Sequence, residues 1–307
     1  MSTTIDLPLL GGGGEPVDLP RTLNSHGFAD LPPMRLVDGA LELTLRAGRW
    51  RPRTVRISPS GRDRGVAEIA GHTPGGAQTE AVRGALLHVL RMDEDLSPLY
   101  AMTANDPDLA WVARGAGRML RSPTVFEDVV KTICATNCAW SATERMVGAI
   151  VQNLGERSPG APADGPWGRA FPSPEDMAEA GERFYRDVAR AGYRAAYLVS
   201  LARSVAEGSI DLEQLAHASP EDLPDDELER LLLALPGVGP YAAAHIMLTI
   251  GRYSRLILDS WTRPKYALLA GKRKVSDAAI ERRFRRYGRF AGLAFWLFVT
   301  RDWIEEP

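Results

Sequence analysis

One carboxylate is the strongest candidate for chemistry in this 307-residue chain. Asp259 follows a short apolar run (LIL) at 256–258. A fixed carboxylate can stabilise positive charge that develops on a substrate, or it can orient and activate a water molecule. An Asp ahead of a helix is also a common N-cap, and one residue can serve both roles. We therefore take Asp259 as the candidate catalytic residue.

A glycine-rich turn precedes this carboxylate at 235–241 (LPGVGPY), between predicted helices at 225–234 and 240–251. Acidic residues open the first helix, and Pro240 suits the first turn of the second. The glycines let another backbone approach closely, and the N-terminal N–H groups of a helix suit a phosphate. We expect Gly237, Val238 and Gly239 to contact such a group. An ordinary helical turn is the alternative interpretation.

Three blocks in one order resemble the helix-hairpin-helix superfamily of DNA glycosylases. The first is the hairpin followed by Asp259. The second, 126–147 (FEDVVKTICATNCAWSATERMV), resembles the helix, wedge loop and helix of 8-oxoguanine and 3-methyladenine glycosylases. The third, 192–197 (GYRAAY), resembles another of their segments. The resemblance runs from about Phe126 to the C-terminus, and it implies an enzyme that cleaves the N-glycosidic bond of a damaged base.

The residue after the hairpin bears on the type of glycosylase. Bifunctional members of the family carry a lysine there, whose amine attacks the sugar and forms a Schiff base. The matching residue here is Tyr241, so the resemblance implies a monofunctional enzyme that uses water. An aromatic at this position resembles 3-methyladenine glycosylases, in which a ring stacks on the base; a core role for Tyr241 is the alternative. Lys265 does not match, and we expect it to contact a phosphate.

Two further segments resemble DNA-distorting parts of the family. Thr136 and Asn137 fall in the wedge loop, where Asn137 would fill the space of an unstacked base and bond to its partner base; unstacking costs a few kcal/mol. Tyr193 and Arg194 resemble a second intercalating and base-reading pair. The alternatives are that Asn137 caps a helix starting near Ser141 and that Arg194 is a solvated surface charge.

Aromatic residues predict the base pocket, which we assign to Tyr241, Trp140, Trp261, Phe295 and Trp296. Such rings favour electron-poor, cationic bases through stacking and cation–π attraction. Phe295 stands where the family's oxoguanine enzymes place a polar amide, and Ala142 stands where they place an arginine. We therefore expect an alkylated or deaminated purine as the substrate.

Composition limits partners and cofactors. The net charge is −2, so a nucleic-acid surface must be local. The dense basic stretches, 272–274 and 282–289, predict either phosphate contacts or a solvated helix face. Cys134 and Cys138 are too few for a zinc site or for the four-cysteine iron–sulfur cluster of some relatives, and we expect both thiols to be buried. By resemblance, the carbonyls of Leu233, Leu235 and Val238 would hold K⁺ or Na⁺; we expect no other cofactor.

Hydrophobic patterning predicts an α+β protein. Residues 1–16, with glycines at 11–14, suggest a flexible tail. Residues 17–100 predict a small antiparallel β domain, since Leu41, Leu43 and Leu45 alternate with polar residues, followed by a helix near 79–92. Residues 101–307 predict a helical domain, and the resemblance implies two lobes flanking a central cleft. Predicted helices lie near 107–116, 124–135, 141–154, 175–190, 193–207, 211–217, 225–234, 240–251, 260–270, 276–286 and 290–302.

The leading hypothesis is thus a monofunctional DNA glycosylase of base excision repair, a cytoplasmic monomer that acts on double-stranded DNA. No apolar run approaches membrane-spanning length, and the N-terminus lacks signal-peptide features. Two alternatives stay open. One is a catalytically silent DNA-binding or damage-sensing module, which has no need of Asp259. The other is an 8-oxoguanine-type glycosylase/lyase, which Tyr241 disfavours.

Overall fold

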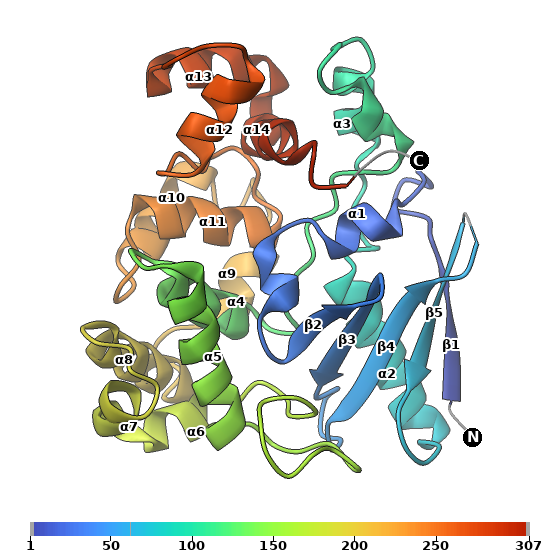
Figure 1. Cartoon of the computed structure of the whole chain (residues 1–307), viewed down its shortest axis with the longest axis vertical. Coiled ribbons are helices and arrows are strands. Elements are labelled where there is room, and N and C mark those ends of the chain that lie inside the picture. Colours follow the sequence, from blue (N-terminus) through green and yellow to red (C-terminus); the bar gives the residue numbers. More distant parts are fainter. Residues whose placement is uncertain (1–2, 62, 305–307) are drawn as a thin grey trace.

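The computed structural model describes residues 3–61 and 63–304. An antiparallel sheet lies toward the N-terminus, and most of the remaining chain is helical (Figure 1). This arrangement confirms the predicted α+β class.

The sheet forms because apolar residues alternate along its strands. Its order is β1-β5-β4-β3-β2, and each neighbouring pair is antiparallel. Leu41 lies opposite Ile57 and Leu43 opposite Val55, and all four are buried, as predicted. The helix α2 (Gly76–Val89) contributes Val82 to the same core. The strands are β1 (Thr3–Pro8), β2 (Met34–Val37), β3 (Ala40–Leu45), β4 (Arg53–Pro59) and β5 (Arg64–Ile69).

The prediction of a flexible tail at 1–16 was wrong for residues 3–16, and its first two residues lie outside the described chain. Strand β1 pairs with β5 along its whole length, from Thr3 opposite Ile69 to Pro8 opposite Arg64. Its apolar side chains alternate and are buried in the sheet core, so the period-two signal was present before the glycines. The expected strands after residue 17 begin later, because α1 (Leu19–Leu23) and the 3₁₀ helix η1 (Gly27–Asp30) come first.

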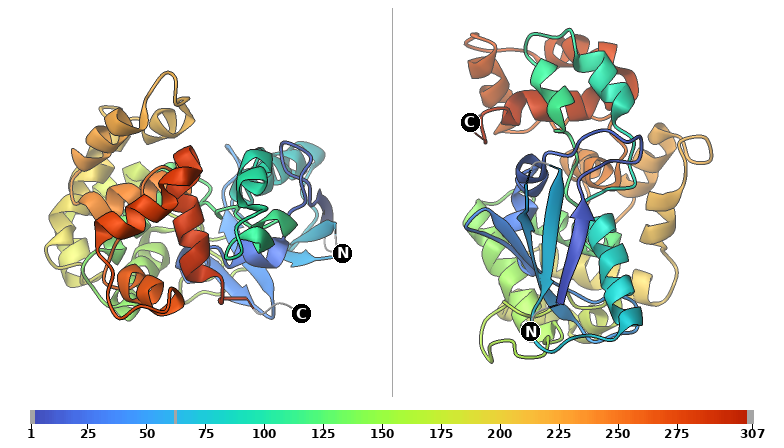
Figure 2. Two further views of the ribbon diagram at one scale, coloured as in Figure 1. Left: turned by 90° about the horizontal axis from the view of Figure 1, so that it is seen from above. Right: turned by 90° about the vertical axis from the view of Figure 1, so that its right-hand side faces the viewer.

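The helical part has two hydrophobic clusters, and α11 (Pro240–Ile250) contributes to both. Ala243 and Met247 pack into one cluster with α4 and α5, while Ala244 and Leu248 pack into the other with α14. Because α11 lies between the clusters, residues at its start face the space that separates them. In Figures 1 and 2, α12, α13 and α14 lie at the end of the molecule away from the sheet.

Most predicted helices are confirmed to within a few residues. The segment 175–190 is divided at Gly181, whose φ of +68° interrupts the helix. The described helices from residue 97 onward are α3 (Ser97–Thr103), η2 (Ala110–Arg114), α4 (Val125–Ala135), α5 (Trp140–Leu154), α6 (Pro174–Glu179), α7 (Gly181–Asp187), α8 (Arg194–Ala206), α9 (Leu212–His217), α10 (Asp225–Leu233), α11, α12 (Thr262–Leu269), α13 (Asp277–Phe284), η3 (Arg285–Phe290) and α14 (Ala291–Thr300).

Candidate active site

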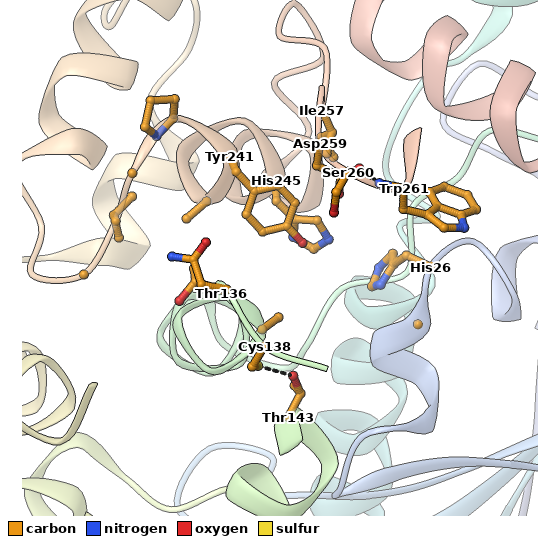
Figure 3. A pocket seen from close by; sticks show the side chains of 18 of the residues that line it. His26, Thr136, Cys138, Thr143, Tyr241, His245, Ile257, Asp259, Ser260 and Trp261 are labelled. Carbon is orange, nitrogen blue, oxygen red and sulfur yellow. Dashed lines mark hydrogen bonds between the residues drawn. The ribbon is translucent and has the colours of Figure 1, made fainter. Parts of the chain in front are cut away.

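A cleft of about 1510 Å³ brings together segments far apart in the sequence. It is lined by residues 26–28, the loop between α4 and α5, the α10–α11 hairpin, residues 257–261 and Trp296 of α14 (Figure 3). Asp259 is the one Asp or Glu among its lining residues in the described chain, and no Lys or Arg lines it. The cleft therefore carries a negative charge without a balancing cation.

Asp259 lines the cleft and bonds to the backbone just before α12. Its Oδ1 accepts hydrogen bonds from the backbone N–H groups of Trp261 (2.8 Å) and Thr262 (2.6 Å) at the start of α12. The Thr262 hydroxyl donates to the carbonyl oxygen of Ile257 and accepts from the Asp259 N–H. Within the described residues Oδ2 has no hydrogen-bond donor. The N-cap position of α12 is Trp261, so Asp259 is not the N-cap residue, but its bonds to these two N–H groups fix the carboxylate without using its second oxygen.

Tyr241 lies in the first turn of α11, close to Asp259 (Figure 3). Burial, and secondarily the negative charge of Asp259, raises the pKa of Tyr241 to about 12. Its hydroxyl therefore stays protonated at neutral pH and can donate a hydrogen bond. The ring packs against both hydrophobic clusters and also lines the cleft, so Tyr241 is both a core residue and a lining residue.

Two histidines at the back of the cleft were missed by the sequence analysis. Their ring centroids are 6.0 Å apart, and that of His245 is also 6.0 Å from Tyr241. Burial lowers the pKa of His26 to about 4 and that of His245 to about 3, so both are neutral. Tyr241 and His245 are four residues apart on one helix, which places them on the same face. This spacing was the sequence signal that could have identified His245 as a cleft residue.

Tryptophans form the outer wall of the cleft. Trp261 lies 6.0 Å from Trp296 and 5.7 Å from Trp303 between ring centroids, and Trp140 also lines the cleft. Trp296 is held by a 2.7 Å hydrogen bond from its indole N–H to the Ser25 carbonyl oxygen. Trp303 was not predicted.

The assignment of Phe295 to the base pocket was wrong. Its side chain is fully buried in the C-terminal cluster, where it packs against Phe284 and Tyr266. Helix α14 is apolar on every side, so its sequence has no polar face to show which residue meets the cleft. Trp296, one position later, is the residue that does.

The wedge loop follows α4 and contains Thr136, Asn137 and Cys138. Asn137 is exposed with a φ of +46°, and its amide lies 3.5 Å from the Tyr193 hydroxyl. It does not cap α5, whose N-cap position is Ala139. The expectation of two buried thiols was wrong for Cys138, because α4 ends at Ala135 and leaves this residue exposed in the loop.

Arg194 is not a solvated surface charge. Its side chain is buried, its Nε donates to the Thr136 hydroxyl at 3.3 Å, and a second nitrogen donates to the Thr136 carbonyl oxygen. The guanidinium also lies 4.5 Å from the centre of the Tyr193 ring. Thr136, Tyr193 and Arg194 therefore form one connected unit beside the cleft.

The hairpin differs in detail from its prediction. Gly237 has a φ of +80°, and an added Cβ would lie 2.8 Å from Tyr197, whereas Gly239 has extended backbone and open space. The N–H of Val238 does not face outward, because it donates to the Leu235 carbonyl oxygen at 3.2 Å. Among the described residues the N–H groups of Gly237 and Gly239 have no hydrogen-bond acceptor, so they can bind an external one.

Lys265 and the basic stretches do not form a phosphate surface on this cleft. Lys265 is outside the lining and pairs with Asp302 at 2.5 Å, and its expected DNA contact stays a prediction. Arg283 pairs with Asp108, and Arg286 with Asp106. These arginines instead tie α13 and η3 to the segment before η2.

The comparisons with known proteins agree with this geometry. No protein-family model matches the chain. It is 26% identical over 298 residues to a probable N-glycosylase/DNA lyase of Methanothermobacter thermautotrophicus, covering 89% of each chain. It is 28% identical over 110 residues to the Bacillus subtilis protein YfjP, whose name gives it as a DNA-3-methyladenine glycosylase. That match covers 36% of this chain and about a third (33%) of the relative's length.

Solved structures show the same fold. A 3-methyladenine DNA glycosylase from Archaeoglobus fulgidus superposes with a TM-score of 0.74 at 21% identity, over 98% of this chain and 100% of that one. The 8-oxoguanine glycosylase/lyase of Clostridium acetobutylicum gives 0.67 at 21% identity, over 90% and 93%. The fold is therefore shared with solved 3-methyladenine and 8-oxoguanine DNA glycosylases, in agreement with the resemblance stated from the sequence. Across the described residues, no helix is both long and apolar enough to cross a membrane.

Proposed function

We propose that the protein is a monofunctional DNA glycosylase of base excision repair, which flips an alkylated or deaminated base out of double-stranded DNA and hydrolyses its N-glycosidic bond. The observation that carries this proposal is the position of Asp259. Its unpaired Oδ2 stands in a cleft walled by Tyr241 and the tryptophans, and no basic side chain among the described lining residues neutralises it.

The chemistry follows from this arrangement. The flipped base stacks on aromatic rings, and the bond from its nitrogen to the sugar breaks with the electron pair leaving on the base. Positive charge then develops on the sugar, where the Asp259 carboxylate stabilises it. A water molecule adds to the same sugar carbon, and Oδ2 can accept a hydrogen bond from that water. An alkylated, cationic base leaves more easily and is attracted to the ring faces.

Tyr241 supports a hydrolytic rather than a lyase reaction. It occupies the position at which bifunctional members of the resembled family carry the nucleophilic lysine. No lysine is found among the lining residues that the structure describes, so no amine is placed to form a Schiff base. The names of the relatives include both types of enzyme, which makes the distinction one for experiment.

We further propose that the hairpin and the wedge loop beside the cleft contact the DNA. One similar solved structure, the Clostridium 8-oxoguanine glycosylase/lyase, is described in complex with double-stranded DNA. By analogy the N–H groups of Gly237 and Gly239 would bind a backbone phosphate. Asn137 and Tyr193 would fill the space left by the flipped base, because both are exposed on adjoining segments.

We also propose that the hairpin binds a monovalent cation. The carbonyls of Leu233, Leu235 and Val238 supply neutral oxygen donors of the kind that K⁺ and Na⁺ accept. Leu233 ends α10, where carbonyls lack intrahelical partners, and Leu235 uses its oxygen for the Val238 N–H. Such a cation would hold the turn that presents the two glycine N–H groups. We propose no other cofactor, and we propose that the enzyme works as a cytoplasmic monomer.

One screen tests the function. The purified protein is incubated with duplexes that carry 3-methyladenine, 7-methylguanine, hypoxanthine, uracil or 8-oxoguanine, and released bases are measured with and without alkali. A monofunctional enzyme releases a base and leaves a strand that breaks only in alkali. Binding without release of any base would favour the damage-sensing alternative, and strand cleavage without alkali would favour the glycosylase/lyase.

A further inference from the structure

His245 lines the cleft and lies close to Tyr241 and His26. It is 6% exposed and one helical turn beyond Tyr241, and Figure 3 places it between Tyr241 and His26. The ring of Phe28 packs against it, with centroids 4.8 Å apart, so the imidazole is held in place.

The hydrogen bonds of α4 fix the tautomer of His245. The Thr132 hydroxyl donates its single hydrogen to the Asp128 carbonyl oxygen at 2.7 Å, and a carbonyl cannot donate in return. The 3.4 Å contact between Thr132 Oγ1 and His245 Nδ1 must therefore be donated by the imidazole. A neutral imidazole has one N–H, so Nε2 of His245 carries a lone pair.

That lone pair is available to a ligand. Nε2 of His245 has no hydrogen-bond partner in the described part of the chain. It is also not sealed inside the protein, because the enclosed unpaired side-chain atoms among the described residues belong to Arg53, Tyr100, Arg118 and Glu127. His26 offers no such group, since its Nε2 donates to the Leu120 carbonyl oxygen and its Nδ1 accepts from the Phe28 N–H.

We propose that His245 reads the flipped base by accepting a ring N–H through Nε2, so that the pocket selects bases whose inserted edge carries a ring N–H. Hypoxanthine and 7-methylguanine have this edge. Adenine and 3-methyladenine instead present a ring nitrogen with a lone pair, which would face the lone pair of Nε2. The proposal rests on the proposed function and narrows its substrate class.

Undamaged guanine carries the same ring N–H, but two other properties of guanine disfavour its release. It must be removed from a stable base pair, which costs more than flipping a mispaired or damaged base. It also lacks the positive charge that makes 7-methylguanine a good leaving group. His245 thus acts as a specificity-determining residue that separates purine lesions from one another.

The test compares His245→Leu with His245→Gln. Leucine removes the acceptor, and glutamine keeps one in its amide oxygen. We expect His245→Leu to release hypoxanthine and 7-methylguanine about tenfold or more slowly while leaving 3-methyladenine release nearly unchanged, and His245→Gln to recover part of the loss. His217→Leu, an exposed position on α9, is the matched control, and thermal melts check folding. An equal loss on all three bases, or none, would overturn the proposal.

A binding measurement separates this inference from the proposed function. Duplexes that contain 2′-fluoro-deoxyinosine or 2′-fluoro-deoxyadenosine resist hydrolysis, so affinity is measured without turnover. The wild-type protein should prefer the inosine duplex, and His245→Leu should lose that preference. Failure of the wild-type protein to release any base would defeat the function alone. An unchanged preference in the variant would defeat the role of His245 alone.

Discussion

The guanidinium of Arg194 donates hydrogen bonds to both the hydroxyl and the carbonyl oxygen of Thr136, which binds the start of α8 to the wedge loop after α4. The side chain is buried, so these bonds leave it little freedom to reach across to a base. The relationship makes Arg194 a positioning residue that holds the loop carrying Asn137.

Replacing Arg194 by lysine should therefore slow base release about equally whichever base lies opposite the lesion. Lysine keeps the charge but cannot bond to both oxygens of Thr136 in the same fork geometry. The measurement is single-turnover release from four duplexes that differ only in the opposing base. Arg203→Lys, at an exposed position of α8, is the control. A loss confined to one opposing base would show that Arg194 reads that base directly.

Substituting Asp259→Asn should reduce base release about a hundredfold or more, because the charge that stabilises the sugar is removed. The variant should fold, since the amide oxygen of Asn can still accept the Trp261 and Thr262 N–H groups. DNA affinity should be unchanged or higher. Single-turnover rates and a binding titration measure both, with Asp164→Asn on an exposed loop as the control. Near wild-type release by Asp259→Asn would exclude this carboxylate from catalysis.

Borohydride should not trap the wild-type protein on damaged DNA, because Tyr241 has no amine to form a Schiff base. Tyr241→Lys places an amine at the start of α11 and should become trappable if the position matches that of the bifunctional enzymes. Denaturing gel electrophoresis of borohydride-treated reactions detects the covalent adduct. A wild-type adduct would contradict the monofunctional proposal, and it would direct attention to Lys265.

Local periodicity was enough to predict most helix positions, and one motif was enough to select Asp259, which the structure places in the cleft. Residues selected by tertiary packing could not be. Trp296 and Phe295 are neighbours on a helix that is apolar throughout, so only the packing of α14 decides which one meets the cleft. His26 precedes η1, far along the chain from His245, and their proximity follows from the way the N-terminal segment crosses the cleft.

Acid should destabilise the wild-type protein relative to His245→Leu. Burial lowers the folded-state pKa of His245 to about 3, below its ordinary value of 6.5, so the unfolded chain binds the proton first as pH falls. The stabilising contribution of neutral His245 is fully present above pH 6.5 and is lost as pH falls toward 3. Near pH 4 the loss in unfolding free energy amounts to about 3 kcal/mol.

The wild-type protein must be compared with His245→Leu, because Asp128 changes the unfolding free energy with pH in the opposite direction. Its pKa is raised by burial to about 7, so its contribution weakens as pH rises. His26 is buried and titrates like His245, and it is present in both proteins. Urea unfolding at pH 7.5 and pH 4 should show the free-energy difference between the two proteins shift in favour of His245→Leu. A difference that does not change with pH would mean that His245 is not held neutral.

The two hairpin glycines should respond differently to valine. Gly239 has extended backbone, and no atom lies within 4 Å of an added Cβ, so Gly239→Val should fold. Its side chain would stand beside the N–H groups offered to a phosphate and should weaken binding to damaged and undamaged duplexes alike, because phosphate contacts carry no base information. Gly237→Val should lose stability instead, since φ is +80° and its Cβ would lie 2.8 Å from Tyr197. Binding titrations and thermal melts of both variants measure this contrast. Loss of affinity by Gly239→Val for the damaged duplex alone would mean that the hairpin contacts the lesion rather than the backbone.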